Sequence, residues 1–404
     1  MMQETFSRKT LLDKKSFSFQ KMPSGIDGFG RIRSIKDLSL SIDGKSFVLD
    51  DMTKLCSSQE EIVLQSVFLK ELLYPGDCVA LKLKDSKVQS IWLLTPNMSQ
   101  QPQQKNQLMY EWFGFKSQLR EFFQKRGFYE VQTPTLVKNP GTEPYLDLFS
   151  TTEIKGGVSK KWYLPTSPEI GLKKLLLQDY RNLFEMRPCF RNNEDSDHHL
   201  SEFWMLEWYR TFATLMTIEY DIKEMLRHFA PSVTLEIKTM AQIFKDHLGF
   251  NLSPATSYEE LQKLAKELNL HIDGIDNWND LFHLIFVDKL EPKVSKGPII
   301  IKNYPPSLCA YARVSDEGWA ERFEFYWNGL EIANAFEELT DPEEQLKRFM
   351  SDLSLKQKLG KEIPELDEEF LQTMQRGLPP TGGIAMGMER FFMAWKGLKT
   401  IRFY

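Results

Sequence analysis

The chain has 404 residues, of which 42% are hydrophobic and 26% are charged. These proportions are close to average globular usage and exclude collagen-like, low-complexity and wholly disordered chains, while the length favours a large domain joined to a smaller one. The net charge of −5 argues against non-specific nucleic-acid binding through sheer positive charge. Residues 1–35 are nevertheless basic, with seven Lys or Arg against three Asp or Glu.

The cysteines and the N-terminal residues indicate in which cellular compartment the protein is expected. Four cysteines are scattered along the chain with no Cys-x-x-Cys pair, which indicates a reducing environment. The first residues contain no apolar core like that of a signal peptide, and no stretch approaches the roughly 18 apolar residues of a membrane span. We therefore expect a soluble, cytoplasmic protein that does not enter a membrane.

The composition changes near residue 100. Residues 98–106 are rich in Gln, Asn, Ser and Pro and are expected to be a linker. Before it we expect a basic tail over 1–25 and, over 26–97, a small all-β domain, because five short apolar runs are separated by Gly, Asp and Ser. This size fits an OB-type barrel, a fold that often binds oligonucleotides but also serves as a docking module.

The second domain is predicted over 107–404. Helical spacing is found at 107–126, 168–178, 257–268 and 343–358, and strand-like runs lie between them. This order predicts an α+β domain with a mostly antiparallel sheet. The sequence contains no Gly-rich dinucleotide-binding motif and no P-loop, so a nucleotide would have to be bound by another kind of site.

The first segment that carries chemistry is residues 182–210, which we expect to be a hairpin with a charged tip. Arg191 ends the outgoing strand and could clamp a phosphate or carboxylate, and Phe203 begins the return strand and could stack on a base. Glu207 and Tyr209, two residues apart, share one sheet face. The alternative is an exposed hairpin whose charges are simply solvated.

The second segment is residues 321–341. Asn-Gly at 328–329 predicts a tight turn between two strands that could aim Glu324 and Glu331 at one site. Hard carboxylate oxygens suit Mg²⁺ that bridges substrate phosphates. Ordinary charged strand ends would give the same composition.

The third segment is residues 377–397, in which small residues precede a helix that starts near Met388. Small side chains let a ligand lie against a strand, and Arg390 in the first helical turn would add its charge to the helix dipole. The three segments together suggest ATP held against a sheet, with catalysis by positioning and charge neutralisation.

Taken in order, these segments resemble the three signature motifs of class II aminoacyl-tRNA synthetases. GFYEVQTPTL resembles the motif of the dimer interface, FRNNEDSDHHLSEFWMLEWYR the ATP hairpin, and GGIAMGMERFFM the last strand and helix. Within the class the chain is similar to lysyl-tRNA synthetases and, more closely over about 107–404, to their paralogues, the elongation factor P–(R)-β-lysine ligases. Ala385 and TSPE, in place of Gly and APE of the synthetases, favour the ligase group.

The resemblance implies a class II catalytic domain preceded by an OB-like domain, together with a set of site residues. It also implies a homodimer, because the first motif would otherwise expose Phe122, Phe128 and Val131. For ATP it implies Arg191 and Arg390 on the phosphates and Phe203 on adenine, together with Asn192 and His199. It implies that Glu324 and Glu331 hold Mg²⁺. The pocket for lysine or β-lysine would be formed by Glu169, Glu207, Tyr209, Asn334, Phe336, Glu338 and Ala385.

Two departures affect the expected function. Asn193 and Leu200 replace a carboxylate and an amide that the resemblance places near ATP, although Glu194 could substitute through a shifted loop. The barrel has few aromatic residues, most of which we expect in its core, so we favour a degenerate barrel over an anticodon reader. The leading prediction is a ligase that adenylates lysine or β-lysine and modifies elongation factor P. The alternatives are a lysyl-tRNA synthetase that charges tRNA-Lys and a non-catalytic regulator that binds an amino acid or tRNA.

Overall fold

The computed structural model describes residues 22–402 apart from short gaps, together with Arg8 and Phe17. The gaps are at 37, 44, 58–60, 66–68, 98–103, 179–180 and 295. The chain forms two compact units that divide after Glu111. This division lies inside helix α3 (Gln104–Gln124), which begins within the predicted linker. Most of that linker lies outside the described residues.

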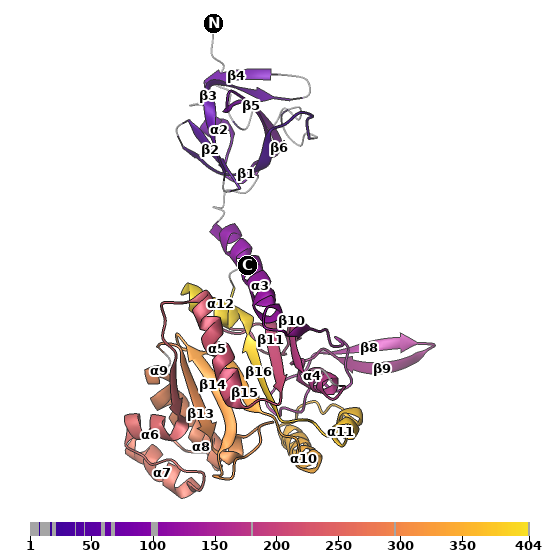
Figure 1. Cartoon of the computed structure of the whole chain (residues 1–404), viewed down its shortest axis with the longest axis vertical. Helices are drawn as coiled ribbons and strands as arrows, with labels where there is room; N and C mark the ends of the chain where they lie inside the picture. The colour runs from indigo at the N-terminus through magenta and orange to yellow at the C-terminus, as the bar shows by residue number, and fades with distance from the viewer. Residues whose placement is uncertain are drawn as a thin grey trace. The chain divides into compact units, whose positions relative to one another are not determined.

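The first unit is a closed β-barrel (Figure 1). Its described elements are β1 (Gly28–Lys36), β2 (Ser39–Ile42), β3 (Lys45–Cys56), β4 (Glu61–Gln65), α2 (Leu69–Leu72), β5 (Cys78–Lys84) and β6 (Lys87–Thr95). Strands β1, β2 and β3 form a meander, β3 pairs with β6 in parallel, and β6 and β5 lead back to β1. This closed order of five strands, with β4 added beside β3, confirms the predicted OB-like fold.

The barrel core is mostly aliphatic, whereas we expected most of the barrel's aromatic residues there. Phe47 is partly buried against the core, and Phe68 lies outside the described residues. Phe29 and Tyr74 keep 65% and 43% of their surface exposed, because branched residues such as Ile32, Leu81 and Ile91 already fill the interior. Phe17, from the predicted tail, is fully buried in this core. The other described residue of that region, Arg8, forms a buried bidentate ion pair with Asp77 at 2.7 Å. The remainder of the tail before Met22 lies outside the described residues.

The second unit is built on an eight-stranded sheet in the order β12-β13-β14-β15-β16-β11-β10-β7 (Figure 1). The strands are β7 (Tyr129–Glu130), β10 (Asn182–Phe190), β11 (Glu202–Thr211), β12 (Glu236–Thr239), β13 (Ile299–Tyr304), β14 (Ala320–Trp327), β15 (Leu330–Glu337) and β16 (Thr381–Gly387). Only the two edge pairings, β12–β13 and β10–β7, are parallel. The predicted α+β class with a mostly antiparallel sheet is confirmed.

Helices and a separate hairpin surround this sheet. The helices besides α3 are α4 (Glu169–Leu176), α5 (Leu215–Phe229), α6 (Met240–Leu248), α7 (Tyr258–Glu267), α8 (Trp278–Ile285), α9 (Glu291–Val294), α10 (Pro342–Lys358), α11 (Glu368–Met374) and α12 (Met388–Lys396). The hairpin of β8 (Ser150–Lys155) and β9 (Val158–Tyr163) extends away from the sheet in Figure 1. Among the described residues, no helix is long and apolar enough to cross a membrane.

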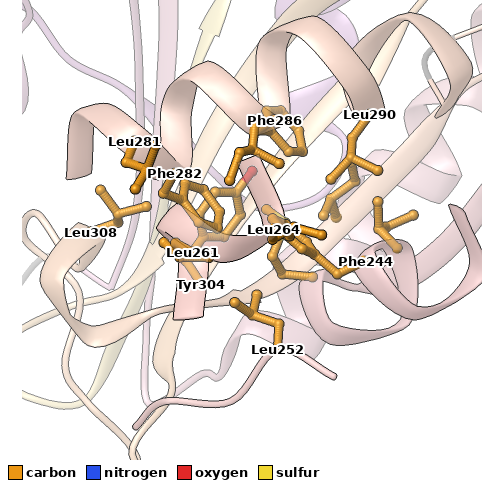
Figure 2. Close-up of a cluster of buried hydrophobic side chains, with 14 of the residues drawn as sticks. Phe244, Leu252, Leu261, Leu264, Leu281, Phe282, Phe286, Leu290, Tyr304 and Leu308 are labelled. Carbon is orange, nitrogen blue, oxygen red and sulfur yellow. The ribbon is translucent and has the colours of Figure 1, made fainter. Parts of the chain in front are cut away.

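Helices α6 to α9 pack on one another and on the outer strands through a hydrophobic cluster (Figure 2). Phe282 stacks on Phe244 at 5.4 Å and on Trp278 at 5.1 Å between ring centroids. Ser257 begins α7 with a capping box, in which its side chain and that of Glu260 each bind the other's backbone N–H. This segment supports the sheet from the side of β13.

The dimer prediction assumed that Phe122, Phe128 and Val131 are exposed in a single chain, and the structure differs. Val131 is partly buried against the hydrophobic cluster of α4 and β10. Phe122 and Phe128 are 3% and 4% exposed, because both pack edge-on against Phe123 within the same chain. The described apolar residues that are exposed here are instead Tyr110 and Phe113 of α3, at 61% and 50%, and Tyr129 and Leu136 after it, at 66% and 48%. The residues offered for a dimer interface were therefore wrong.

Candidate active site

The site lies on one face of the four central strands. The strand register places Glu207 of β11 beside Ala385 of β16, Ala385 beside Asn334 of β15, and Asn334 beside Glu324 of β14. Residues two positions away along a strand point to the same face, so Phe336 belongs to it as well. The Asn-Gly turn that joins β14 to β15 has the predicted geometry, with both residues at positive φ.

A cavity of about 450 Å³ opens over this face. Its walls come from the sheet, the loop after β10, the start of α12 and a loop before β8. The predicted site residues that line it are Glu169, Arg191, His199, Phe203, Glu207, Glu331, Asn334, Phe336, Ala385 and Arg390. Three segments that are far apart in sequence thus meet in one cavity.

Four predicted residues do not line the cavity. The side chain of Asn192 donates to the Leu148 carbonyl at 3.4 Å. Tyr209 lies behind Glu207 and donates to its carboxylate at 3.1 Å, and Glu338 is 1% exposed and ion-paired. Glu324 accepts hydrogen bonds from Tyr304 at 2.6 Å and from Tyr326 and Arg322.

One end of the cavity is cationic. The guanidinium of Arg191 lies 5.1 Å from the centre of the Phe203 ring, and its buried Nε has no hydrogen-bond partner among the described residues. Arg390 projects from the first turn of α12, and its Nη1 donates to the Glu331 carbonyl at 3.0 Å. Two arginines and a helix N-terminus make this end suitable for a polyphosphate.

The other end is acidic and buried. Glu207 is 1% exposed and its Oε1 has no partner among the described residues. Burial, reinforced by the charge of Glu169, raises the pKa of Glu207 well above its usual value. An oxygen that has lost water without gaining a donor favours a ligand that brings one, such as an ammonium group.

Lys173 connects the remaining carboxylates, and the sequence reasoning missed it. Its Nζ lies 2.5 Å from Glu169 Oε1 and 2.6 Å from Glu338 Oε2, with the lysine side chain only 2% exposed. Burial alone would lower the pKa of Lys173, but the charges of Glu169 and Glu338 outweigh it and raise the pKa. The spacing of four residues from Glu169 on α4 was the available signal.

The loop after β10 shows how the altered hairpin sequence is accommodated. Asn193 adopts a left-handed backbone conformation (φ 60°), which asparagine tolerates, and its side chain turns away to Asp147 at 3.0 Å. The next residue, Glu194, then lines the cavity. Leu200 also lines it and adds apolar surface.

Comparison with known proteins identifies the family. Residues 94–403 match the family model described as tRNA synthetases class II (D, K and N). The chain belongs to the class II tRNA synthetase family. Relatives of this synthetase-family protein include enzymes named elongation factor P–(R)-β-lysine ligase. That of Histophilus somni strain 2336 is 36% identical over 70% of this chain and 89% of the relative. That of Pasteurella multocida strain Pm70 is 34% identical over 70% of this chain and 90% of the relative.

Membership of the class II family implies ATP use, and the cavity is chemically suited to it. Arg191 and Arg390 would hold phosphates, and the Phe203 ring would stack on the base. A divalent cation would find carboxylate oxygens on Glu331, where burial and then the charge of Glu324 raise the pKa to about 7. Among the described residues, no cluster of three or more possible metal ligands is present.

Gly383, on β16 of this class II synthetase domain, is predicted to tolerate no side chain. A Cβ there would lie 2.3 Å from Glu338 Oε1 and 2.3 Å from Tyr209 Cε1. We expect Gly383→Ala to lose about 1–3 kcal/mol of stability through overpacking and to weaken lysine binding. Thermal unfolding and calorimetric titration would measure both. Gly297→Ala, where the added Cβ meets no atom of the described residues within 4 Å, is the control, and equal behaviour of the two variants would contradict the prediction.

Proposed function

We propose that the protein uses ATP to activate lysine or β-lysine as an aminoacyl-adenylate and transfers the acyl group to a lysine side chain of elongation factor P. The observation that carries this proposal is one cavity with two unlike ends. Arg191 and Arg390 suit the phosphates at one end, and the unpartnered oxygen of Glu207 suits a side-chain ammonium at the other. We take elongation factor P as the acceptor of the acyl group because it appears in the names of the relatives.

The chemistry would proceed in two displacements. A carboxylate oxygen of the amino acid attacks the α-phosphorus of ATP, the bond to the β-phosphate oxygen breaks, and diphosphate leaves. The amine of the acceptor lysine then attacks the acyl carbon, the bond to AMP breaks, and the amine loses a proton to solvent. Arg191 would stabilise the charge that develops on the α-phosphate, and Glu207 would fix the substrate so that its carboxylate reaches the phosphorus. Of the two expected ligands, Glu331 lines the cavity and would hold Mg²⁺, which would supply neutralisation of phosphate charge.

Two measurements test the proposal. Lysine-dependent exchange of labelled diphosphate into ATP reports adenylate formation. Incubation of the protein with ATP, each lysine isomer and elongation factor P, followed by intact mass, reports transfer. Absence of exchange with every isomer would favour a non-catalytic regulator, and exchange without a mass increase would exclude this acceptor.

Lysine binding is expected to strengthen as the pH rises. Burial, reinforced by the charge of Glu169, raises the pKa of Glu207, whose unpartnered oxygen belongs to the cavity. Below its raised pKa the Glu207 carboxyl is protonated and no longer attracts an ammonium group. One carboxyl that loses its proton between pH 6 and pH 8 implies about a tenfold fall in the dissociation constant over that range. Calorimetric titration at several pH values would measure it, and a constant affinity would contradict the assignment.

A second candidate function is the charging of tRNA-Lys. The complete OB-like topology of the first unit favours it, because such barrels often bind single-stranded nucleic acid. The exposed Phe29 is available for stacking on a base. An acid-gel assay with tRNA-Lys distinguishes the two candidates, since the elongation factor ligase would form adenylate but leave the tRNA uncharged.

We also propose a homodimer. The segment that resembles the class II dimer motif exposes Tyr129 and Leu136, which would be covered by a partner. Light scattering tests this, and a mass near 47.3 kDa would exclude it.

A further inference from the structure

Glu143 lines the same cavity, although it belongs to none of the three segments in which we expected chemistry. It lies on a loop before β8, on a wall formed apart from the sheet. Its carboxylate is repelled by Glu169 and attracted by Arg191. Among the described residues, no lysine or arginine side chain forms an ion pair with it.

The loop is held from behind, so that Glu143 is presented in a fixed place. Lys356 of α10, only 1% exposed, donates to the backbone carbonyls of Glu143 and Leu146, both at 2.8 Å. The preceding Thr142 donates to Asp352 of the same helix at 3.1 Å. Burying a lysine ammonium group is costly unless its hydrogen bonds are satisfied. The two carbonyls satisfy them here, so Lys356 fixes the position of the loop.

Gly141 makes room for the carboxylate itself. Its φ is +127°, and a Cβ at this position would lie 2.2 Å from Glu143 Oε2. The Glu143 carboxylate therefore lies directly over the glycine backbone. Both the backbone and the side chain of Glu143 are thus constrained by neighbouring residues.

Two other polar groups in the cavity indicate which part of a ligand the Glu143 carboxylate would bind. The unpartnered Oε1 of Glu207 marks the place for one ammonium group, and the unpartnered Nε of Arg191 marks the end where phosphate and the reacting carboxylate lie. Glu143 lines this cavity together with Arg191 and Glu169, and the charges of both act on its carboxylate. This places Glu143 at the end of the cavity where the reacting carboxylate and a second amino group of the substrate would lie.

Resting on the proposed function, we propose that Glu143 binds the α- or β-ammonium group of the substrate and selects for diamino acids. Glu207 would hold the distal ammonium, and the two carboxylates would recognise the two charges of lysine or β-lysine. The groups that face Glu143 are Glu169, Arg191, Tyr311 and Lys356. Burial and then Glu169 raise the pKa of Glu143 to about 7, so binding of a cation near neutral pH would release a proton from it.

The test compares ligands with and without the second amine. Dissociation constants of lysine, (R)-β-lysine and 6-aminohexanoate would be measured by calorimetry for the wild type, for Glu143→Gln and for the exposed control Glu317→Gln. We expect Glu143→Gln to weaken lysine about 10- to 100-fold, as for a lost hydrogen bond between charged groups, and to leave 6-aminohexanoate nearly unchanged. The proton release near pH 7 on lysine binding should also diminish, which a purely structural role would not cause.

The outcomes separate this inference from the proposed function. Unchanged lysine binding by Glu143→Gln, or equal weakening of lysine and 6-aminohexanoate, would overturn the inference while wild-type diphosphate exchange still supports the function. A wild type that binds neither lysine isomer would overturn both.

Discussion

Replacing Arg191 with alanine is expected to slow lysine-dependent diphosphate exchange about 100- to 1,000-fold, the effect of removing one preorganised donor at a site of developing charge. Arg191 is held in place by the hairpin, because it directly follows β10 and its backbone N–H donates to the Ser201 carbonyl at 3.0 Å. Its Nε is buried and unpartnered among the described residues. The donor therefore needs no rearrangement when the transition state forms.

Arg191→Lys is the matched variant. Lysine keeps the charge but loses the planar fork of donors, so we expect it to recover only part of the rate. Lysine binding in the absence of ATP should change little in either variant, because Glu207 and Glu169 remain. Wild-type exchange by Arg191→Ala would show that this arginine does not act on the phosphates.

Replacing Lys173 with methionine is expected to cost about 3–5 kcal/mol of folding stability, because it leaves buried carboxylates without their cation. The loss should depend on pH. Without Lys173 the pKa of Glu338, already raised to about 7 by burial, would rise further. The folded state then binds a proton that the unfolded state releases, so the stability of the variant falls as the pH rises through the neutral range. Denaturant unfolding at pH 6 and pH 8.5 would measure the difference.

Lys174→Met is the control for this experiment. The adjacent lysine pairs with Asp367 and Glu369, but its side chain is 22% exposed and that of Glu369 is 80% exposed. Pairs in contact with water contribute about 0–1 kcal/mol. Equal destabilisation by the two replacements would indicate that the buried cluster is not held together by charge.

The sequence was sufficient for several elements and for most of the cavity lining, but α5, α6 and the hairpin of β8 and β9 were not predicted. The Asn-Gly turn, the charged hairpin around Arg191 and the small residues of β16 are local signals, and each led to the correct strand or turn. Resemblance to a family supplied Glu169, Asn334 and Phe336, whose chemistry alone would not have distinguished them from other polar or aromatic residues.

What the sequence could not provide were contacts between distant segments. Lys173 and Glu338 are 165 positions apart in the sequence, and no local pattern predicts that their side chains form an ion pair. Glu143 lies in a loop whose place depends on Lys356 of α10. Phe122 and Phe128 appeared to need a partner, because their packing against Phe123 depends on how α3 turns into β7.

The place of β16 has a consequence for the making of the protein. This strand is near the end of the chain, but it lies in the middle of the sheet and pairs with β11 on one side and β15 on the other. In a nascent chain that ends before Thr381, β11 and β15 would lack the strand that joins them. The sheet surface between Glu207 and Asn334 would then be missing. The enzyme should thus be unable to consume ATP during its own translation, and any truncation before β16 should abolish the cavity as a whole.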